Sequence, residues 1–360
     1  MINKIQLKNF KSIQHINIML QPINILLGQN GAGKSNFIHL FKLMNKLLNK
    51  DLQLYVAEQR MDRLLYFGRR YSQLIDIHLQ FNTIGYGVIL LPSSDDRLVI
   101  QKEYVEWSAN DNKQVNGSQS KMLALPGALE SSLPKPGDFT IESQVSSYLD
   151  EWKIYHFHDT IDAAPIKNAC DLNDNYYLRP QAENLAAFLY AIKETSAFQK
   201  ILSTVQRVAP FIQNFVLKPD KLNPQRIRLR WKHFGSDDYL DAYSLSDGTL
   251  RFISLTTLLL QPVLPGIILL DEPELGLHPY AIQLLAGLIQ SVSHQTQIIV
   301  STQSVTLANE FDCNDIVVVK YENNASTFIR LDESHLKLWL EQYAIGDIWQ
   351  KNLIGGVPTC

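Results

Sequence analysis

The sequence predicts an α/β protein with an antiparallel β patch near the N-terminus, a parallel-sheet core that carries a glycine-rich loop, and a short helical insertion. The core is predicted by three short, uninterrupted apolar runs that are separated by helical runs, at residues 266–271, 297–301 and 315–320. Strands that are apolar on both faces and alternate with helices are typical of a parallel sheet covered on both sides. The alternation of apolar and polar residues over 2–7 and 13–18 predicts two half-buried strands of the N-terminal patch.

The remaining elements follow from periodicity along the chain. A short apolar strand over 23–27 ends at a glycine, and helical spacing after it predicts a helix over 35–48. Further strands of the antiparallel patch and two helices of the insertion are expected at 74–81, 87–91, 98–107, 183–192 and 196–208. Residues 108–147 are rich in Asn, Ser, Gln, Pro and Gly, which predicts a mobile loop.

Composition and charge exclude several classes of protein. Of the 360 residues, 46% are hydrophobic and 19% are charged, which excludes an intrinsically disordered chain. The net charge of -3 provides no overall basic surface, so any surface for nucleic acid must be local. The three cysteines lie far apart without metal-ligand spacing, which disfavours disulfide scaffolds and zinc sites.

The N-terminus lacks the continuous apolar segment of a secretory signal, so we expect the mature chain to start at Met1. The uncharged stretch over 252–270 is long enough to suggest a membrane span, but Pro262, Pro265 and Gly266 interrupt it. We therefore expect a soluble, cytoplasmic protein with no membrane partner.

The glycine-rich loop matches the phosphate-binding pattern of a glycine, four residues and Gly-Lys-Ser in full. Its glycines let successive backbone N–H groups point at phosphate oxygens, and the following helix adds the positive end of its dipole. Lys34 is expected to contact the β- and γ-phosphates, and Ser35 to ligate Mg²⁺. An incidental glycine turn is the alternative, and the predicted strand before and helix after argue against it. The nucleotide-binding residues expected here are Gly28, Gln29, Asn30, Gly31, Ala32, Gly33, Lys34, Ser35 and Asn36.

Two acidic residues at the end of an apolar strand supply a second half of such a site. Asp271 is expected to hold Mg²⁺ through water, and Glu272 to orient or deprotonate the attacking water. The alternative is a capped strand end. Lys34 and Asp271 are far apart in the sequence, so a large segment is inserted between them.

A third group of candidates starts a predicted helix over 250–260. Ser246 or Asp247 could simply be its N-cap. However, the phosphate loop, the Leu-Ser-x-Gly helix start and the run Asp-Glu-Pro-Glu-x-Gly-Leu-His-Pro occur in the order seen in the ATP-binding heads of ABC and SMC-like ATPases, which this sequence resembles. Within that group it is most similar to the RecF- and OLD-like predicted bacterial ATPases, with Asn-Phe-Lys-Ser at 9–12 and Asp247-Gly248 in place of Gly-Gly. The resemblance covers the first 50 residues and about 243–320 firmly, and the middle only loosely.

The resemblance implies an ABC-type ATP-binding head over 1–110 and 240–330 with ATP and Mg²⁺ as cofactors. The remaining parts are then an insertion over 111–239, with a loop, a short helical arm and a basic strand, and a helical tail over 331–360. It also implies that Lys11 and Ser12 approach the nucleotide and that residues 274–278 cross a dimer interface. Ser246, Asp247 and Gly248 would bind the γ-phosphate held by the opposite subunit of a head-to-tail homodimer or higher oligomer.

Gln303 occupies the place of the family's switch histidine. An amide can hydrogen-bond a γ-phosphate or the attacking water but cannot take a proton, so a slow or partner-stimulated ATPase is expected. The expected catalytic residues are Lys34, Glu272 and Gln303.

The resemblance points to prokaryotic anti-phage defence, in which such ATPases act as sensors beside separately encoded effectors such as nucleases. The sequence shows no carboxylate cluster of a metal nuclease, which disfavours cleavage of nucleic acid by this chain itself. It also shows no long coiled coil, which disfavours the tethering role of chromosome-organising SMC proteins. Two alternatives stay open: a RecF-like ATPase of DNA repair or recombination, and an ATP-gated scaffold with negligible turnover.

Local basic runs are the candidates for DNA binding. Arg226, Arg228, Arg230 and Lys232 alternate with apolar residues, which predicts one strand with four charges on one face. Either this face contacts a DNA backbone or it is simply solvated. The same alternatives hold for a second cluster, which contains Arg60, Arg63, Arg69 and Arg70.

Two further features have a structural and a functional interpretation. The strand-like run over 152–159 places His156 and His158 on one face, and packing explains them better than metal ligation because no third ligand is evident. In the tail, Trp349 and Leu353 either pack on the sheet or dock a partner.

Overall fold

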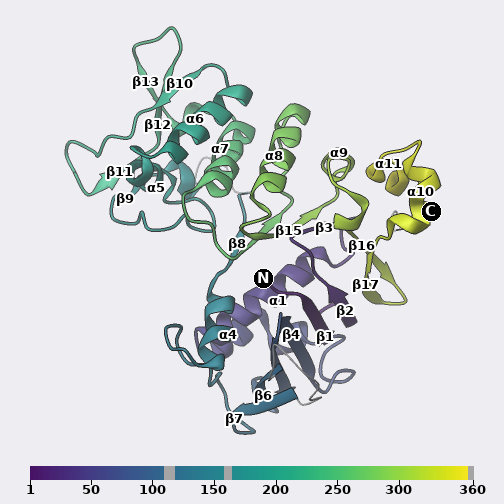
Figure 1. Cartoon of the computed structure of the whole chain (residues 1–360). Coiled ribbons are helices and arrows are strands. Elements are labelled where there is room, and N and C mark those ends of the chain that lie inside the picture. The colour runs from purple at the N-terminus through teal and green to yellow at the C-terminus, as the bar shows by residue number, and fades with distance from the viewer. Residues whose placement is uncertain (109–117, 158–163, 356–360) are drawn as a thin grey trace.

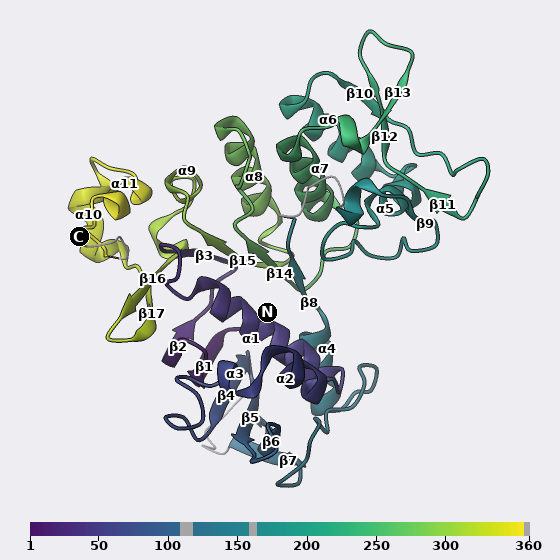
Figure 2. The same ribbon diagram turned by 180° about the vertical axis from the view of Figure 1, so that it is seen from behind.

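Two six-stranded sheets form the body of the molecule, and the computed structural model describes it over residues 1–108, 118–157 and 164–355 (Figure 1). Helix α1 (Lys34–Leu48) lies between the two sheets, as the opposite view also shows (Figure 2). One sheet is antiparallel and the other is mainly parallel. The predicted α/β class, with an antiparallel patch and a parallel core, is confirmed.

The antiparallel sheet has the strand order β2-β1-β4-β5-β6-β7. The predicted alternation is confirmed in β1, where Ile5 and Leu7 are buried, and β1 pairs with β2 from Lys4↔Met19 to Phe10↔Ile13. This register places the turn residues Lys11 and Ser12 at one end of the sheet. The strands are β1 (Lys4–Phe10), β2 (Ile13–Met19), β4 (Ile75–Phe81), β5 (Ile84–Pro92), β6 (Leu98–Ser108) and β7 (Ser118–Ala124).

The second sheet has the order β17-β16-β3-β15-β14-β8, and all neighbours except β16 and β17 are parallel. The strand that precedes the glycine-rich loop, β3, therefore pairs with β15 on one side and β16 on the other. The strands are β3 (Ile23–Leu27), β8 (Trp152–Tyr155), β14 (Ile267–Asp271), β15 (Gln297–Thr302), β16 (Ile316–Glu322) and β17 (Ala325–Arg330).

Successive residues of these strands face two different cores because side chains alternate across a strand. Leu269 belongs to the core shared with α1 and the antiparallel sheet, whereas Ile268 and Leu270 belong to the core on the opposite face. Burial on both faces explains why the sequence shows uninterrupted apolar runs here. The opposite face is covered by α7 (Asp247–Leu260), α8 (Pro279–Val292) and α9 (Val305–Ala308) (Figure 1).

The two predicted helices of the insertion are α5 (Leu185–Ile192) and α6 (Ser196–Val208), and α6 packs against α7. Short strands surround them and make a compact unit rather than a long arm (Figure 2). These strands are β9 (Cys170–Asp171), β10 (Ile212–Phe215), β11 (Arg226–Ile227), β12 (Arg230–His233) and β13 (Tyr239–Asp241).

The segment that was expected to be a loop and the start of the insertion is partly built into the head. β7 joins the antiparallel sheet, α4 (Ile141–Asp150) packs against α1, and β8 pairs with β14. The Trp152 ring of β8 lies 4.8 Å from the Phe41 ring of α1. β7 is an edge strand with a mostly polar sequence, so it gave no alternation to detect. The insertion boundary expected at 111 therefore needs correction. Residues 108–147 were predicted to include a loop, and of these residues 109–117 lie outside the described residues.

The tail packs on the head, as one interpretation of its sequence predicted. Trp349 is 8% exposed and lies in the core beside α9, so the hypothesis that it docks a partner is wrong, although Leu353 is exposed. Among the described helices, none is long and apolar enough to cross a membrane. The remaining helices are α2 (Leu52–Gln59), α3 (Met61–Leu64), α10 (Glu333–Leu340) and α11 (Ile345–Gln350).

Candidate nucleotide site

The carboxyl ends of β3, β14 and β15 meet at one edge of the parallel sheet. The register pairs Asp271 with Ser301, and Thr302 with Leu27. The residues that follow these positions are the glycine-rich loop, Glu272 and Gln303. Ligands of open α/β sheets bind outside the carboxyl ends of the strands, so this edge is the place to expect one.

The glycines of the loop are required by its backbone geometry. Gly31 and Gly33 have φ values of 79° and 111°, in the left-handed region that favours glycine. A Cβ atom at Gly28 would overlap the backbone carbonyl oxygen of Val319 in β16. The Gly28 N–H donates to the Thr302 carbonyl oxygen at 3.3 Å, which ties the loop to the end of β15.

Lys34 spans this loop from the first turn of α1. Its Nζ donates to the carbonyl oxygens of Gly28 at 2.6 Å and Gln29 at 3.0 Å. Burial lowers the pKa of Lys34, while the nearby Glu272 and Asp271 carboxylates act in the opposite direction. The structure thus brings Lys34 and both acidic candidates together, although they are distant in sequence.

Asp271 and Glu272 lie at the end of β14. The Ser301 hydroxyl donates to the Asp271 carboxylate, and His156 Nδ1 lies 4.0 Å from the other carboxylate oxygen. Glu272 has a φ of 42°, and its N–H donates to the Ser301 carbonyl at 2.8 Å.

The oxygen donors at this edge fit Mg²⁺. No group of three or more His, Cys, Asp or Glu side chains that could hold a metal exists in the described part of the chain. Mg²⁺ is usually held by one or two carboxylates plus substrate phosphates and waters, so the Asp271 carboxylate and the Ser35 hydroxyl form a sufficient protein contribution.

The turn between β1 and β2 lies beside the start of α1. The Asn36 side-chain N–H donates to Ser12 Oγ at 2.7 Å, and the hydroxyls of Ser12 and Ser326 are 2.6 Å apart. Lys11 has a φ of 52°, and burial together with Lys42 lowers its pKa. The structure therefore places Lys11, Ser12 and Asn36 next to the glycine-rich loop.

Ser246, Asp247 and Gly248 start α7, and Ser246 Oγ accepts the Thr249 N–H at 3.2 Å as its N-cap. Lys167 Nζ lies 3.5 Å from the Asp247 carboxylate. Among the described residues, no hydrogen bond or ion pair joins these three positions to residues 28–36. α7 and α1 lie on opposite sides of the parallel sheet (Figure 1).

Gln303 directly follows β15. The hydroxyl of the residue before it, Thr302, donates to the carboxylate of Glu274. No individual role was assigned to Glu274 from the sequence. Its spacing after the Asp271-Glu272 pair was the available signal, but burial of a carboxylate in a loop has no sequence pattern.

A histidine and a lysine on α1 also went unnoticed in the sequence. His39 and Lys42 follow Ser35 by four and seven residues, so all three lie on one helix face. Burial, then Lys11 and Lys42, lowers the pKa of His39 to about 4. Asp271 and His156 also act on His39 electrostatically, so this group borders the candidate metal ligand. His158, which was expected on the same strand face as His156, lies outside the described residues.

The basic run over 226–232 is not one strand. Arg226 belongs to β11 and donates to the Ala169 carbonyl, whereas Arg230 starts β12 in a different sheet. Lys232 pairs with Asp237 at 3.1 Å. The apolar positions between them are buried as expected, but the predicted single face with four charges is wrong because the chain changes sheets at Arg228 and Leu229.

Comparison with protein-family models finds two overlapping matches. The model described as AAA domain, putative AbiEii toxin, Type IV TA system matches residues 110–309. The model described as AAA ATPase domain matches residues 1–125. No curated protein matches the sequence significantly.

Solved structures of Smc head domains resemble the fold. One is the SmcHead bound to the C-winged helix domain of ScpA, at 17% identity and a TM-score of 0.58, with 93% of this chain and 99% of that chain covered. Another is the Smc head domain with an extended coiled coil bound to the C-terminal domain of ScpA, derived from Pyrococcus furiosus, at 15% identity and a TM-score of 0.53, with coverages of 95% and 98%.

Proposed function

The chain belongs to the family described as AAA domain, putative AbiEii toxin, Type IV TA system, and we propose from this premise that it is a Mg²⁺-dependent ATPase that regulates a partner protein. An ATPase of the AAA and SMC-head type is the activity that family and fold share. The observation that carries the proposal is the convergence of Lys34 with Asp271 and Glu272 at one sheet edge.

The proposed reaction is the attack of water on the γ-phosphate. Lys34 offsets charge on the β- and γ-phosphates, Ser35 and Asp271 hold Mg²⁺, and Glu272 orients the water. When bound, Mg²⁺ would neutralise part of the charge that develops on the phosphates. Gln303 offers a hydrogen bond without a proton acceptor, which supports slow or partner-stimulated turnover.

We propose that two chains dimerise head to tail in the presence of ATP, because α7 and the glycine-rich loop do not meet within one chain. The partner would be a separately encoded effector such as a nuclease in anti-phage defence. The toxin-system name of the family and the OLD-like motifs support this assignment. An ATP-gated scaffold with negligible turnover is the alternative that Gln303 supports.

The assignment is tested with two variants. Lys34→Ala should lose most ATP binding, because the charge opposite the phosphates disappears. Glu272→Gln should bind ATP with the wild-type affinity and release phosphate at least about 100-fold more slowly, because an amide cannot assist the water. Fluorescent-nucleotide titration and phosphate-release assays measure the two quantities. Wild-type ATP affinity in Lys34→Ala would contradict the site, and normal turnover in Glu272→Gln would move the base elsewhere.

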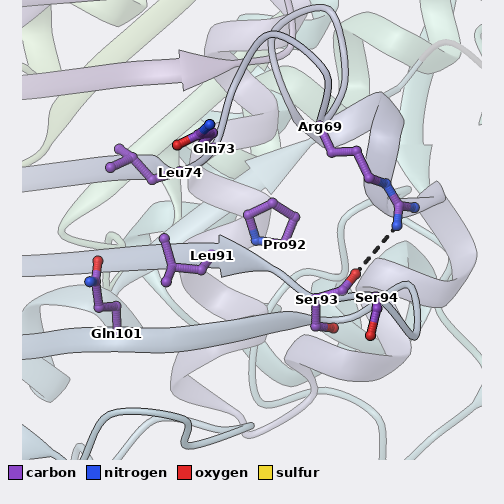
Figure 3. A pocket seen from close by; sticks show the side chains of 8 residues that line it. All are labelled: Arg69, Gln73, Leu74, Leu91, Pro92, Ser93, Ser94 and Gln101. Carbon is purple, nitrogen blue, oxygen red and sulfur yellow. Dashed lines mark hydrogen bonds between the residues drawn. The ribbon is translucent and has the colours of Figure 1, made fainter.

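A second candidate function is nucleic-acid binding in the RecF manner, and one surface favours it. Arg69 pairs with both Asp62 and Asp96, and it also donates to the Ser93 carbonyl beside a surface cavity of about 560 Å³ (Figure 3). Arg60, Arg63 and Arg70 are exposed and have no ion pair among the described residues.

Exposed aromatic rings lie beside these arginines in the sequence. Phe67 is 52% exposed and Tyr71 is 78% exposed, and their ring centroids are 5.7 Å apart. Arginines beside exposed rings suit phosphates and unpaired bases. Replacing both Arg63 and Arg70 with Ala should therefore weaken binding of a single-stranded oligonucleotide and lower the salt slope by about 1 to 2. Arg207→Ala on α6 is the control, and equal binding by all variants would remove this candidate.

A further inference from the structure

Glu274 is the buried acidic group at this edge that the proposed reaction does not use. It follows Asp271 by three residues and is 6% exposed, whereas the next residue, Leu275, is exposed. Burial raises its pKa. A carboxyl group withdrawn from water lowers stability unless its oxygens are hydrogen-bonded, so its bonds need an explanation.

One oxygen of Glu274 is bonded and the other is not. The Thr302 hydroxyl, directly before Gln303 in the chain, donates to Oε1. Oε2 is buried and has no hydrogen-bond partner among the described residues. A buried carboxyl group with one unpartnered oxygen contributes little to stability, which suggests that its position matters for the nucleotide site instead.

The bonded oxygen acts on the segment that carries Gln303. The Thr302 hydroxyl also accepts the Ser304 N–H at 2.9 Å, so the hydroxyl that Glu274 binds connects the two neighbours of Gln303. The Thr302 carbonyl accepts the N–H of Gly28, the first residue of the glycine-rich loop. Thr302 thus connects the loop, Glu274 and Gln303.

The segment after β14 carries Glu272 as well as Glu274, and the Glu272 N–H donates to the Ser301 carbonyl. The ends of β14 and β15 are therefore joined by the Glu272 backbone, by the Ser301 hydroxyl on Asp271 and by the Glu274 side chain. Of these three connections, the Glu274 side chain is the one that reaches Thr302, so its loss would release the residue directly before Gln303 from the segment that carries Glu272.

We propose that Glu274 is a positioning residue for hydrolysis, which fixes Thr302 and Gln303 against the loop of Glu272 so that the Gln303 amide faces the terminal phosphate. This role rests on the proposed ATPase function. Glu274 accepts a hydrogen bond and does not touch the nucleotide or transfer a proton.

The test separates hydrolysis from binding. Glu274→Ala should lower kcat at least about 10-fold, because small displacements of catalytic groups are costly in rate. The Kd for ATP should stay within about 3-fold, since the change affects only the reaction step. Glu274→Gln should keep kcat within about 3-fold of the wild type, because the amide oxygen accepts the same hydrogen bond from the Thr302 hydroxyl.

Glu142→Ala is the matched control, since Glu142 is 8% exposed on α4 and pairs with Lys121 away from the site. It should change thermal stability but not kcat. If Glu274→Ala does not fold, Thr302→Val tests the same role, because it removes the hydroxyl donor at nearly constant volume. This variant should lower kcat at unchanged ATP affinity.

The outcomes distinguish this role from the proposed function. If turnover disappears in Lys34→Ala but stays within about 2-fold of the wild type in Glu274→Ala, the role of Glu274 is overturned and the ATPase assignment stands. Thr302→Val takes the place of Glu274→Ala in this comparison if the latter does not fold. Equal loss of kcat in Glu274→Gln and Glu274→Ala also overturns it, because hydrogen-bond acceptance would not be the property required. Wild-type turnover no higher than that of Lys34→Ala contradicts the ATPase assignment and this role together.

Discussion

His39 lies on the face of α1 that also carries Ser35 and Lys42, and its charge depends on the fold. Its pKa is about 4 in the folded chain, below the ordinary value of 6.5, because of burial and the neighbouring cations. Between these two pH values the unfolded chain binds more protons than the folded chain. The free energy of unfolding should therefore fall as the pH decreases from about 6.5 to 4, by at most about 3 kcal/mol from this group.

Urea denaturation at pH 7 and pH 4.5 measures this effect. His39→Gln should lose less unfolding free energy over that interval than the wild type, because its side chain does not titrate. A decrease of the same size in both proteins would show that other groups cause the acid sensitivity.

At the scale of elements, two glycines of the same loop should respond differently to a methyl group. The Cβ atom added in Gly31→Ala has open space around it. This variant should lower the unfolding free energy by about 1 kcal/mol, because an alanine is strained in the left-handed backbone conformation of this position. Gly28→Ala should cost about 3 kcal/mol, because its Cβ would push β3 away from the Val319 carbonyl of β16. Denaturant titration of both variants checks this difference, and equal losses would contradict the close contact between loop and strand.

The sequence predicted those elements whose pattern directly reflects their environment. Leu269 and Leu270 face different cores, which requires the apolar run that marked β14. The phosphate loop was predictable because its residues form one contiguous pattern in the sequence, although Gly28 is also required by the close approach of Val319 in β16, which only the fold creates. β7 was not assigned, because a polar edge strand leaves a weak pattern. The strand-like run that begins at Trp152 was recognised, but it was placed in the insertion, whereas β8 pairs with β14 of the head. The basic run was misassigned because burial of Ile227, Leu229 and Trp231 alternates although the chain changes sheets. Glu274 escaped notice because its importance lies in its contact with Thr302, which only the fold creates.

At the scale of the whole molecule, the prediction concerns sites shared between two chains. Ser246→Arg should leave ATP binding nearly intact and block hydrolysis, because it adds bulk and charge at the proposed interface. A mixture of Ser246→Arg with Lys34→Ala should regain up to about half the turnover per dimer, since a head-to-tail pair contains one complete site. Phosphate release from the mixture measures the recovery.

The control mixture contains Ser246→Arg and the double variant Lys34→Ala/Ser246→Arg, which cannot form a complete site. ATP-dependent dimerisation of Glu272→Gln is measured alongside, because strict coupling of two sites could make the recovery small. A Glu272→Gln protein that stays monomeric with saturating ATP and Mg²⁺, combined with no recovery in the mixture, would count against shared sites.

The position of β3 also determines when during synthesis the protein can bind nucleotide. β3 is made well before its hydrogen-bonding neighbours β15 and β16. A growing chain therefore presents the glycine-rich loop on a strand without either neighbour until β15 has been made, and without the second until β16 follows. Long-range pairing of this kind slows folding and prolongs the exposure of apolar strands. We expect the nascent chain to need protection by chaperones, and nucleotide to stabilise only the finished protein.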